Sequence, residues 1–377
     1  MNWEIQDAQR LLRSDLSGTR AVTATPPPAN RDAANYLIEM SKSKVVATRN
    51  LVHEAQRLLE ARADQFEIVQ WQSDLPCERS WLLENVAGAS GLLIMVSDKI
   101  DEDLLEAAGT QLKAIATFTA GADHIDLAAL EKRGIRLGYL TDCLSDAVAD
   151  LAVMLILMAQ RRAGEAMARV SRGEWPQMPW HPLLMTGPQI RGATVGFLGF
   201  GRISQAVLKR LMAFDIKTAI YITSKPGKPA REDHYGLFRR TIRVEVARDL
   251  DQLASESDVV VVGCALTPKT KHLVDANFLG KMKSTAVFVN IARGPVTDTN
   301  ALVQALDQQK IFGAGLDVIE GEPDIPDDHP ILRQPRCVIL PHIGSATVQT
   351  RTQMAVESVQ NLLAGLTGGA MVNEWNL

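Results

Sequence analysis

The strongest constraint on the fold of this chain is an alternation of strand-like and helical patterns that begins at residue 44. Short runs rich in apolar and β-branched residues alternate with segments whose apolar residues recur at helical spacing, such as 51–63 and 101–108. This order is typical of parallel βαβ units. The strand-like runs form two series, the first at 45–49, 66–71, 91–96, 113–118 and 135–139 and the second at 193–198, 218–223, 258–263, 285–291, 312–318 and 337–341.

The length of 377 residues suits about two domains. The two series therefore predict an α/β protein with two doubly wound parallel-sheet domains of the Rossmann/flavodoxin-like type. The last helical pattern, about 347–366, needs an apolar surface, and its return to the first domain would place an active-site cleft between the domains. The predicted divisions are 1–43, a partly disordered N-terminal extension; 44–145 plus 343–377, a substrate-binding domain; and 146–342, a dinucleotide-binding domain with a dimerisation helix and loop.

Composition argues against several classes of protein. The net charge of −4 and the pI near 6.0 give no overall basic field, so we expect neither nucleic acid nor membrane as a partner. The longest apolar run, 151–159, is far shorter than the roughly 20 residues of a membrane span. The cysteines lack metal or redox spacing, so we expect no metal site and reduced thiols. They are Cys77, Cys143, Cys264 and Cys337.

The N-terminal residues bear on where the protein works. Residues 1–43 contain Pro26-Pro27-Pro28 and scattered arginines. A transit peptide is usually poor in acidic residues, whereas Glu4, Asp7 and Asp15 lie near the start. We therefore expect a cytoplasmic protein, with mitochondrial import as the alternative.

A glycine turn between a strand and a helix predicts a nucleotide site. Residues 193–198 have the pattern of a buried strand, Gly199 and Gly201 form the turn, and residues 205–214 have the pattern of a helix. Two glycines permit a tight turn and let the backbone approach a pyrophosphate, which then lies at the positive end of the helix. A purely structural turn is the alternative, and the correct flanking elements favour the nucleotide.

The choice of nicotinamide cofactor depends on the end of the next strand. An NAD enzyme usually places Asp or Glu there, about 20 residues past the glycines, to accept hydrogen bonds from the ribose. This chain has Ser224 and Lys225 there, followed by Lys228. No carboxylate would repel a 2′-phosphate, so we predict NADPH as the preferred cofactor and NADH as the alternative. Lysines that merely face solvent are the competing interpretation.

Three polar residues follow apolar, strand-like runs in the second series. Arg293 comes after 285–291, Glu322 follows Gly315-Leu316-Asp317-Val318, and His342 follows 337–341. Ligands bind at the carboxyl ends of parallel strands. An arginine can clamp a carboxylate, and a histidine can protonate a carbonyl. The trio therefore predicts a site that binds and reduces a 2-keto acid. The competing interpretations are a surface ion pair for Arg293, solvated charge for Glu322 and a core position for His342.

These motifs, in this order, resemble the D-2-hydroxyacid dehydrogenase family, and most closely its glyoxylate/hydroxypyruvate reductase branch. The resemblance covers about residues 44–377. The chain departs from the family pattern at three positions, where Ser204 replaces a glycine, Asp150 replaces a glutamate and Ala120 replaces a valine. The matching motifs are Gly199-Phe200-Gly201-Arg202-Ile203, Asn290-Ile291-Ala292-Arg293-Gly294, Gly315-Leu316-Asp317-Val318, Glu322-Pro323 and Leu340-Pro341-His342-Ile343-Gly344-Ser345-Ala346-Thr347.

The resemblance implies an activity, the NAD(P)H-dependent reduction of glyoxylate and hydroxypyruvate to glycolate and D-glycerate. Two alternatives remain open: a reductase of another 2-keto acid, or a nicotinamide-sensing binding protein similar to the family's corepressor. The implied catalytic residues are Arg293, Glu322 and His342. The implied substrate-binding residues are Ser97, Ala120, Gly121, Arg293 and Trp180. The implied cofactor-binding residues are Gly199, Gly201, Arg202, Ile203, Ser224, Lys225, Cys264, Thr270, Ile291, Asp317 and Gly344.

A homodimer is expected for two reasons. The pattern at 146–162 predicts a helix that is apolar on every face, and a second copy of the chain could cover what one domain leaves open. The adjoining loop contains Trp175 and Trp180, and it resembles a family segment that places a tryptophan at the neighbour's substrate pocket. We choose Trp180 for that role. The alternative is that both indoles pack inside the dimer contact.

Overall fold

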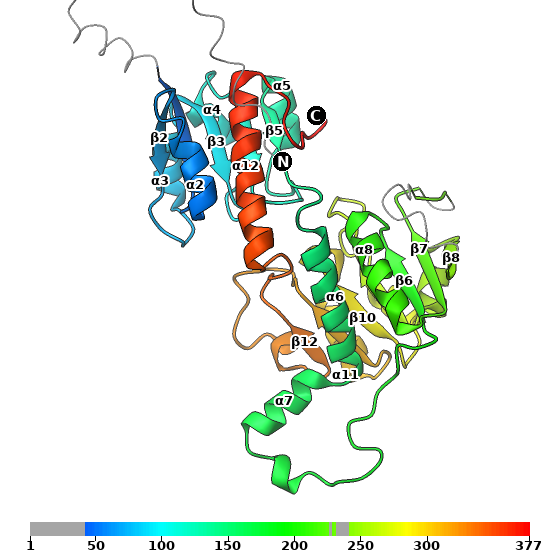
Figure 1. Cartoon of the computed structure of the whole chain (residues 1–377). Helices are drawn as coiled ribbons and strands as arrows, with labels where there is room; N and C mark the ends of the chain where they lie inside the picture. The colour runs from blue at the N-terminus through cyan, green and yellow to red at the C-terminus, as the bar shows by residue number, and fades with distance from the viewer. Residues whose placement is uncertain (1–41, 226–227, 231–240) are drawn as a thin grey trace, which may run out of the picture. The chain divides into compact units, whose positions relative to one another are not determined.

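The computed structural model describes residues 42–225, 228–230 and 241–377, which form two parallel β-sheets flanked by helices (Figure 1). The contacts among the described residues group Ser43–Leu377 into one compact unit. The extension expected at 1–43 lies outside the described residues except for its last two, and Ser43 already begins the first strand. The predicted α/β class with two doubly wound sheets is confirmed. The division into functional domains stays a prediction.

The first sheet has five strands in the order β2-β1-β3-β4-β5, and every pair is parallel. The strand order reverses between β1 and β3, and open α/β sheets bind ligands at such a switch point. Central strands β3 and β4 are buried along their whole length, as their unbroken apolar sequences predict. The strands are β1 (Ser43–Ala47), β2 (Phe66–Gln70), β3 (Ala89–Ile94), β4 (Ala114–Thr117) and β5 (Arg136–Gly138).

Helices α2 (His53–Glu60), α3 (Arg79–Val86), α4 (Glu102–Ala108), α5 (Leu127–Arg133) and α12 (Val348–Thr367) accompany this sheet. The last of them, α12, packs on β3, β4 and β5 and against α2, so the prediction that it returns to the first sheet is confirmed. Its first turn is capped by Thr347, whose hydroxyl accepts a hydrogen bond from Thr350 N.

The second sheet has seven strands in the order β12-β11-β10-β9-β6-β7-β8, with the switch point between β6 and β9. The sequence did not predict β8, because this edge strand alternates Arg243-Val244-Glu245-Val246 and has no buried residue. The strands are β6 (Thr194–Leu198), β7 (Thr218–Ile222), β8 (Arg243–Val246), β9 (Val259–Val262), β10 (Val287–Asn290), β11 (Gly313–Leu316) and β12 (Cys337–Ile339). The accompanying helices are α8 (Arg202–Leu211), α9 (Leu250–Glu256), α10 (Ala276–Lys281), α11 (Thr299–Asp307) and the 3₁₀ turns η2 (Met212–Phe214), η4 (Gly294–Val296) and η5 (Pro330–Arg333).

The apolar helix expected at 146–162 is α6 (Ser145–Gln160), which packs on α8 and on β10, β11 and β12. The prediction that every face is apolar was wrong. Asp146 and Asp150 lie on an exposed stripe, and both carboxylates pair with Arg210 of α8, at 2.9 and 2.5 Å. Most of the other side chains are buried by this chain itself. The packing of α6 therefore gives little support to a second copy.

A different segment exposes apolar side chains. Helix α7 (Ala163–Ser171) follows α6 and has no buried residue, and the 3₁₀ turn η1 (Trp175–Gln177) comes after it (Figure 1). We call residues 163–187 the arm. Its exposed apolar residues are Met167, Val170, Trp175, Trp180 and Leu183.

Candidate active site

The glycine turn has the geometry that a dinucleotide requires. Gly199 adopts φ +90°, and a Cβ there would lie 2.7 Å from the backbone nitrogen of Cys264, so only glycine fits. Gly201 precedes the first turn of α8, and a Cβ there would meet nothing within 4 Å. The open space beside Gly201 fits a phosphate that approaches the amino end of α8.

Ser204 replaces a glycine of the family pattern without disturbing the helix. Its side chain is fully buried, and its hydroxyl donates to the carbonyl of Gly199 at 2.8 Å. A Cβ at Gly263 would lie 2.3 Å from this hydroxyl, so the small residue after β9 makes room for the serine. Ser204 therefore ties the turn to the helix.

The end of β7 carries the residues expected to select the cofactor. Ser224 and Lys225 are both exposed, and Lys225 N donates to the hydroxyl of Thr223 at 3.2 Å. Residues 222–225 contain no carboxylate. Lys228 is also exposed, and the stretches 226–227 and 231–240 lie outside the described residues. The described end of β7 therefore has no carboxylate that would repel a 2′-phosphate.

Three other predicted cofactor residues lie at neighbouring strand ends. Cys264 follows β9 and packs against Gly199, and burial raises the pKa of its thiol to about 11. Thr270 lies in the same loop, where its hydroxyl donates to the carbonyl of Ala265 at 2.7 Å. Ile291 follows β10 and is buried. Another candidate, Arg202, forms an ion pair with Asp142 at 2.6 Å.

Asp317 organises the loop that carries the histidine. It is buried, and its two carboxylate oxygens accept hydrogen bonds from the backbone N–H groups of Ile343 and Gly344, both at 2.8 Å. Burial raises the pKa of this carboxyl group, although the two N–H donors and His342 oppose the shift. Each oxygen retains a second lone pair, which leaves Asp317 able to accept a hydrogen bond from a nicotinamide amide.

His342 and Glu322 form a close pair. Nδ1 of His342 lies 2.9 Å from Oε1 of Glu322, and Oε2 of Glu322 accepts a hydrogen bond from Ile319 N at 3.0 Å. The backbone N–H of His342 donates to the carbonyl of Asp317 at 2.8 Å. The carboxylate fixes the ring through Nδ1, so Nε2 is the nitrogen that can serve a substrate.

Arg293 lies against the loop that follows β4. Its Nε donates to Oδ1 of Asp123 at 2.9 Å, and its Nη1 donates to the carbonyl of Ala292 at 2.9 Å. A Cβ at Gly121 would lie 2.3 Å from Nη2 of Arg293, so the predicted substrate loop and the predicted clamp touch each other. Asp123 was not predicted as a site residue. Its place just after Ala120 and Gly121 was the one signal in the sequence.

Ser97, the weaker substrate candidate, follows β3 beside the first switch point. Its hydroxyl accepts a hydrogen bond from Nη2 of Arg49 at 2.7 Å. Arg49 itself is only 8% exposed, and its Nη1 donates to the carbonyl of Thr48. The buried carboxylate of Asp98 lies 4.0 Å from Arg49. Arg49 was not predicted as a site residue, because it follows its strand without any motif around it.

Trp180 lies on the arm and is 91% exposed, so within one chain it does not enclose a site. Ala120, by contrast, packs at the edge of the core that supports the second sheet. The structure thus brings together Arg293 and Gly121 directly, and His342, Glu322 and Asp317 in a second group of contacts.

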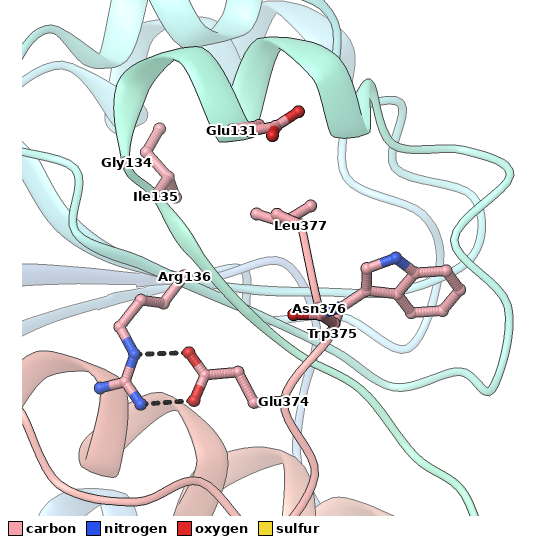
Figure 2. A pocket seen from close by; sticks show the side chains of 8 residues that line it. All are labelled: Glu131, Gly134, Ile135, Arg136, Glu374, Trp375, Asn376 and Leu377. Atoms are coloured by element: carbon pink, nitrogen blue, oxygen red, sulfur yellow. Dashed lines mark hydrogen bonds and ion pairs between the residues drawn. The ribbon is translucent and has the colours of Figure 1, made fainter.

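The structure also has a pocket at the amino end of β5, lined by other residues than those of the predicted site. Arg136 there donates twice to the carboxylate of Glu374, both times at 2.7 Å (Figure 2). Because ligands of parallel sheets bind at the carboxyl ends of strands, this pocket is a poor candidate for the active site. Its lining contains none of the predicted site residues and consists of Glu131, Gly134, Ile135, Arg136, Glu374, Trp375, Asn376 and Leu377.

The fold and the glycine turn define a dinucleotide-binding α/β protein of the Rossmann type. The family described as D-isomer specific 2-hydroxyacid dehydrogenase, NAD binding domain, matches residues 153–344. The chain is also 44% identical over 334 residues to the human glyoxylate reductase/hydroxypyruvate reductase, covering 89% of this chain and 98% of that protein. The chain therefore belongs to the D-isomer specific 2-hydroxyacid dehydrogenase family.

Two solved structures share the fold. A protein from Thermus thermophilus superposes with a TM-score of 0.77 at 39% identity, covering 88% of this chain and 100% of that one. The NADPH-dependent glyoxylate/hydroxypyruvate reductase of Sinorhizobium meliloti, in complex with NADP and malonate, superposes with a TM-score of 0.74 at 29% identity, covering 89% and 97%. The family expected from the sequence motifs is confirmed.

Proposed function

We propose that this protein reduces glyoxylate and hydroxypyruvate to glycolate and D-glycerate with a nicotinamide cofactor. The observation that carries the proposal is the pairing of His342 with Glu322 at 2.9 Å, within a family whose relatives include named glyoxylate/hydroxypyruvate reductases. An imidazole held in this way has one nitrogen left for a substrate, which is what an acid catalyst needs.

In this proposal the nicotinamide supplies the hydride, and the protein's residues bind and protonate. Arg293 binds the carboxylate and the keto oxygen of the substrate, with the backbone N–H groups of Ala120 and Gly121 as further donors. His342 donates the proton from Nε2 to the carbonyl oxygen, while Glu322 stabilises the protonated ring. Asp317 orients the nicotinamide amide. Ser97 is a further contact to the substrate.

We propose NADPH as the preferred cofactor and NADH as the alternative. Support comes from the absence of a carboxylate at 222–225, from the exposed Lys225, and from the named NADPH dependence of the S. meliloti relative. Gly199, Gly201, Arg202, Ile203, Ser224, Lys225, Cys264, Thr270, Ile291, Asp317 and Gly344 are proposed as the cofactor-binding residues.

The activity is tested by initial rates of NADPH and NADH oxidation with glyoxylate, hydroxypyruvate, pyruvate and phenylpyruvate. Turnover of the first two with high kcat/KM supports the proposal, whereas a clear preference for either of the others indicates another 2-keto acid. A protein that binds nicotinamide without turnover would support the corepressor-like alternative.

The cofactor preference is tested by the ratio of kcat/KM for NADPH and NADH in the parent and in a Ser224→Asp, Lys225→Ala variant. We expect the variant to shift the ratio toward NADH, because the new carboxylate repels a 2′-phosphate and the lost ammonium no longer attracts it. A parent that prefers NADH tenfold would show that the lysines merely face solvent.

We further propose a homodimer and a cytoplasmic location. The exposed apolar residues of the arm support the dimer, because large side chains such as tryptophan are favoured at protein interfaces. In the dimer, Trp180 reaches the partner's substrate pocket. The location rests on the composition of the chain, and mitochondrial import stays the alternative. Among the described residues, no helix is long and apolar enough to span a membrane.

A further inference from the structure

Asp123 contacts the arginine on which substrate binding depends, although 170 residues separate the two in the sequence. Its Oδ1 accepts a hydrogen bond from Nε of Arg293 at 2.9 Å, and the side chains of Arg293 and Asp123 are 19% and 27% exposed. Partial burial and the opposite charges make this hydrogen bond stronger than a typical surface ion pair.

The guanidinium is held at two points. Nε binds Asp123, and Nη1 binds the backbone carbonyl of Ala292 in the arginine's own loop. Because the guanidinium is planar and rigid, these two bonds set the direction of Nη2. Among the described residues Nη2 has no hydrogen-bond partner, and it lies against Gly121.

Gly121 completes the arrangement. A Cβ at this position would lie 2.3 Å from Nη2 of Arg293 and 2.8 Å from Oδ1 of Asp123. The absence of a side chain therefore lets the ion pair lie directly on the backbone of the loop after β4. Nη2 of Arg293 therefore lies beside the backbone of the predicted substrate loop at Gly121.

We propose that Asp123 is a positioning residue that orients Arg293 for the carboxylate of a 2-keto acid. This inference rests on the proposed function. Asp123 does not touch the substrate; it fixes the Nε edge of the guanidinium, so that Nη2 is presented beside the N–H groups of the 120–121 loop. Preorganised donors bind a carboxylate better than a freely rotating side chain, because less side-chain entropy is lost on binding.

Asp123 could instead block Arg293, and the change in KM on its removal would then have the opposite sign. If the carboxylate of Asp123 occupied Arg293 as a substitute for the substrate, removing it would free the arginine and lower KM for the keto acid. Orientation predicts a higher KM, since the arginine loses a fixed direction. The sign of the change in KM therefore separates the two roles.

The test compares Asp123→Ala and Asp123→Asn with the parent in steady-state reduction of glyoxylate with NADPH. For Asp123→Ala we expect KM for glyoxylate to rise at least about tenfold, as when a hydrogen bond to a charged group is lost, with a smaller change in kcat. Asp123→Asn keeps an oxygen that accepts from Nε, and it should recover most of the loss. The Kd of NADPH, measured by fluorescence, should stay the same in both.

Glu102→Ala is the matched control, because Glu102 forms a surface ion pair with Arg133 at 2.7 Å, outside the loop after β4. It should leave KM unchanged. Arg293→Lys provides a second control. In the Arg293→Lys background, Asp123→Ala should raise KM for glyoxylate little further, since lysine has no guanidinium Nε–H to orient.

An unchanged or lowered KM for glyoxylate in Asp123→Ala overturns the inference. So does an increase in KM that is as large in the Arg293→Lys background as in the parent. Failure of the parent to reduce any 2-keto acid instead overturns the proposed function. If Asp123→Ala does not fold, Asp123→Ser takes its place, with the affinity of oxamate for the NADPH complex as the measurement. Binding about tenfold weaker than in the parent supports orientation by Asp123, and parent-like or tighter binding overturns it.

Discussion

At the scale of single residues, two short contacts define the chemistry proposed for this protein. His342 Nδ1 lies 2.9 Å from Glu322, and Arg293 Nε lies 2.9 Å from Asp123. In each pair a carboxylate holds a nitrogen-bearing side chain in one orientation. The remaining nitrogens, Nε2 of the imidazole and Nη2 of the guanidinium, are then the ones available to a keto acid.

Loss of either nitrogen-bearing group should abolish most catalysis. Arg293→Ala removes the carboxylate clamp and His342→Ala removes the acid, so kcat/KM should fall at least roughly 100-fold in each. Both variants should still bind the cofactor, which fluorescence titration can confirm. His53→Ala, at an exposed position on α2, is the control. Near-normal turnover in either variant would contradict the assignment.

Glu322→Gln should lower kcat. Oε1 of Glu322 lies 2.9 Å from Nδ1 of His342 and holds the ring, so a neutral amide at this position gives the proton donor a weaker and less fixed partner. We expect kcat for the reduction of glyoxylate to fall at least about tenfold, while the Kd of NADPH stays the same. Glu320→Gln is the matched control, because Glu320 forms a similar pair with His272 at 2.9 Å. Equal kcat for the parent and Glu322→Gln would show that the ring does not depend on this partner.

At the scale of elements, close packing between α12 and the first sheet depends on glycine. At Gly138 of β5, a Cβ would lie 2.5 Å from the Cβ of Asn361, which belongs to the middle of the helix. Asn361 also donates to the carbonyl of Tyr139 at 3.1 Å, so the helix cannot move away without breaking that bond. The loop that carries His342 leads directly into this helix.

Gly138→Ala should therefore destabilise the protein by about 1–3 kcal/mol, the usual cost of overpacking. Chemical denaturation followed by circular dichroism measures the change. Gly280→Ala in α10 is the control, since a Cβ there meets nothing within 4 Å and should leave stability equal or slightly higher. Equal stability of Gly138→Ala and the parent would show that the helix can shift to accommodate a methyl group.

At the scale of the whole molecule, the question is where a second copy binds. Helix α6 exposes Asp146 and Asp150, which pair with Arg210 of the same chain, so this helix no longer argues for a dimer. The arm exposes Trp175 and Trp180, at 60% and 91%. We therefore expect the dimer contact to include the arm.

For the arm we predict both the oligomeric state of the parent and the selectivity of a variant. The parent should sediment as a dimer, and Trp180→Ala should change the ratio of kcat/KM for glyoxylate and hydroxypyruvate without dissociating it. Trp175→Ala should leave this ratio as it is. A monomeric parent contradicts the shared pocket, and dissociation of Trp180→Ala with unaltered selectivity indicates that the indole is structural.

The sequence by itself determined the class of fold. It also predicted that the site residues of the second sheet lie at the carboxyl ends of its strands. It could do so because strands, helices and the glycine turn leave local patterns, and because side chains that follow parallel strands must emerge at the same edge of the sheet. The family's Glu-Pro motif singled out Glu322 from the acidic residues around it, and the structure places Glu322 in contact with His342.

Only the tertiary structure decided which distant groups meet. Asp123 and Arg293 come from different sheets, Arg49 and Ser97 follow different strands, and no periodicity relates such residues. Strand β8 was not predicted because it lies at the edge of the sheet, where the residues are only partly buried and show no clear hydrophobic pattern. Asp146 and Asp150 stand four residues apart in the sequence, but their pairing with Arg210 depends on how α8 packs on α6. Local patterns report burial along one element, whereas these pairings depend on how separate elements pack.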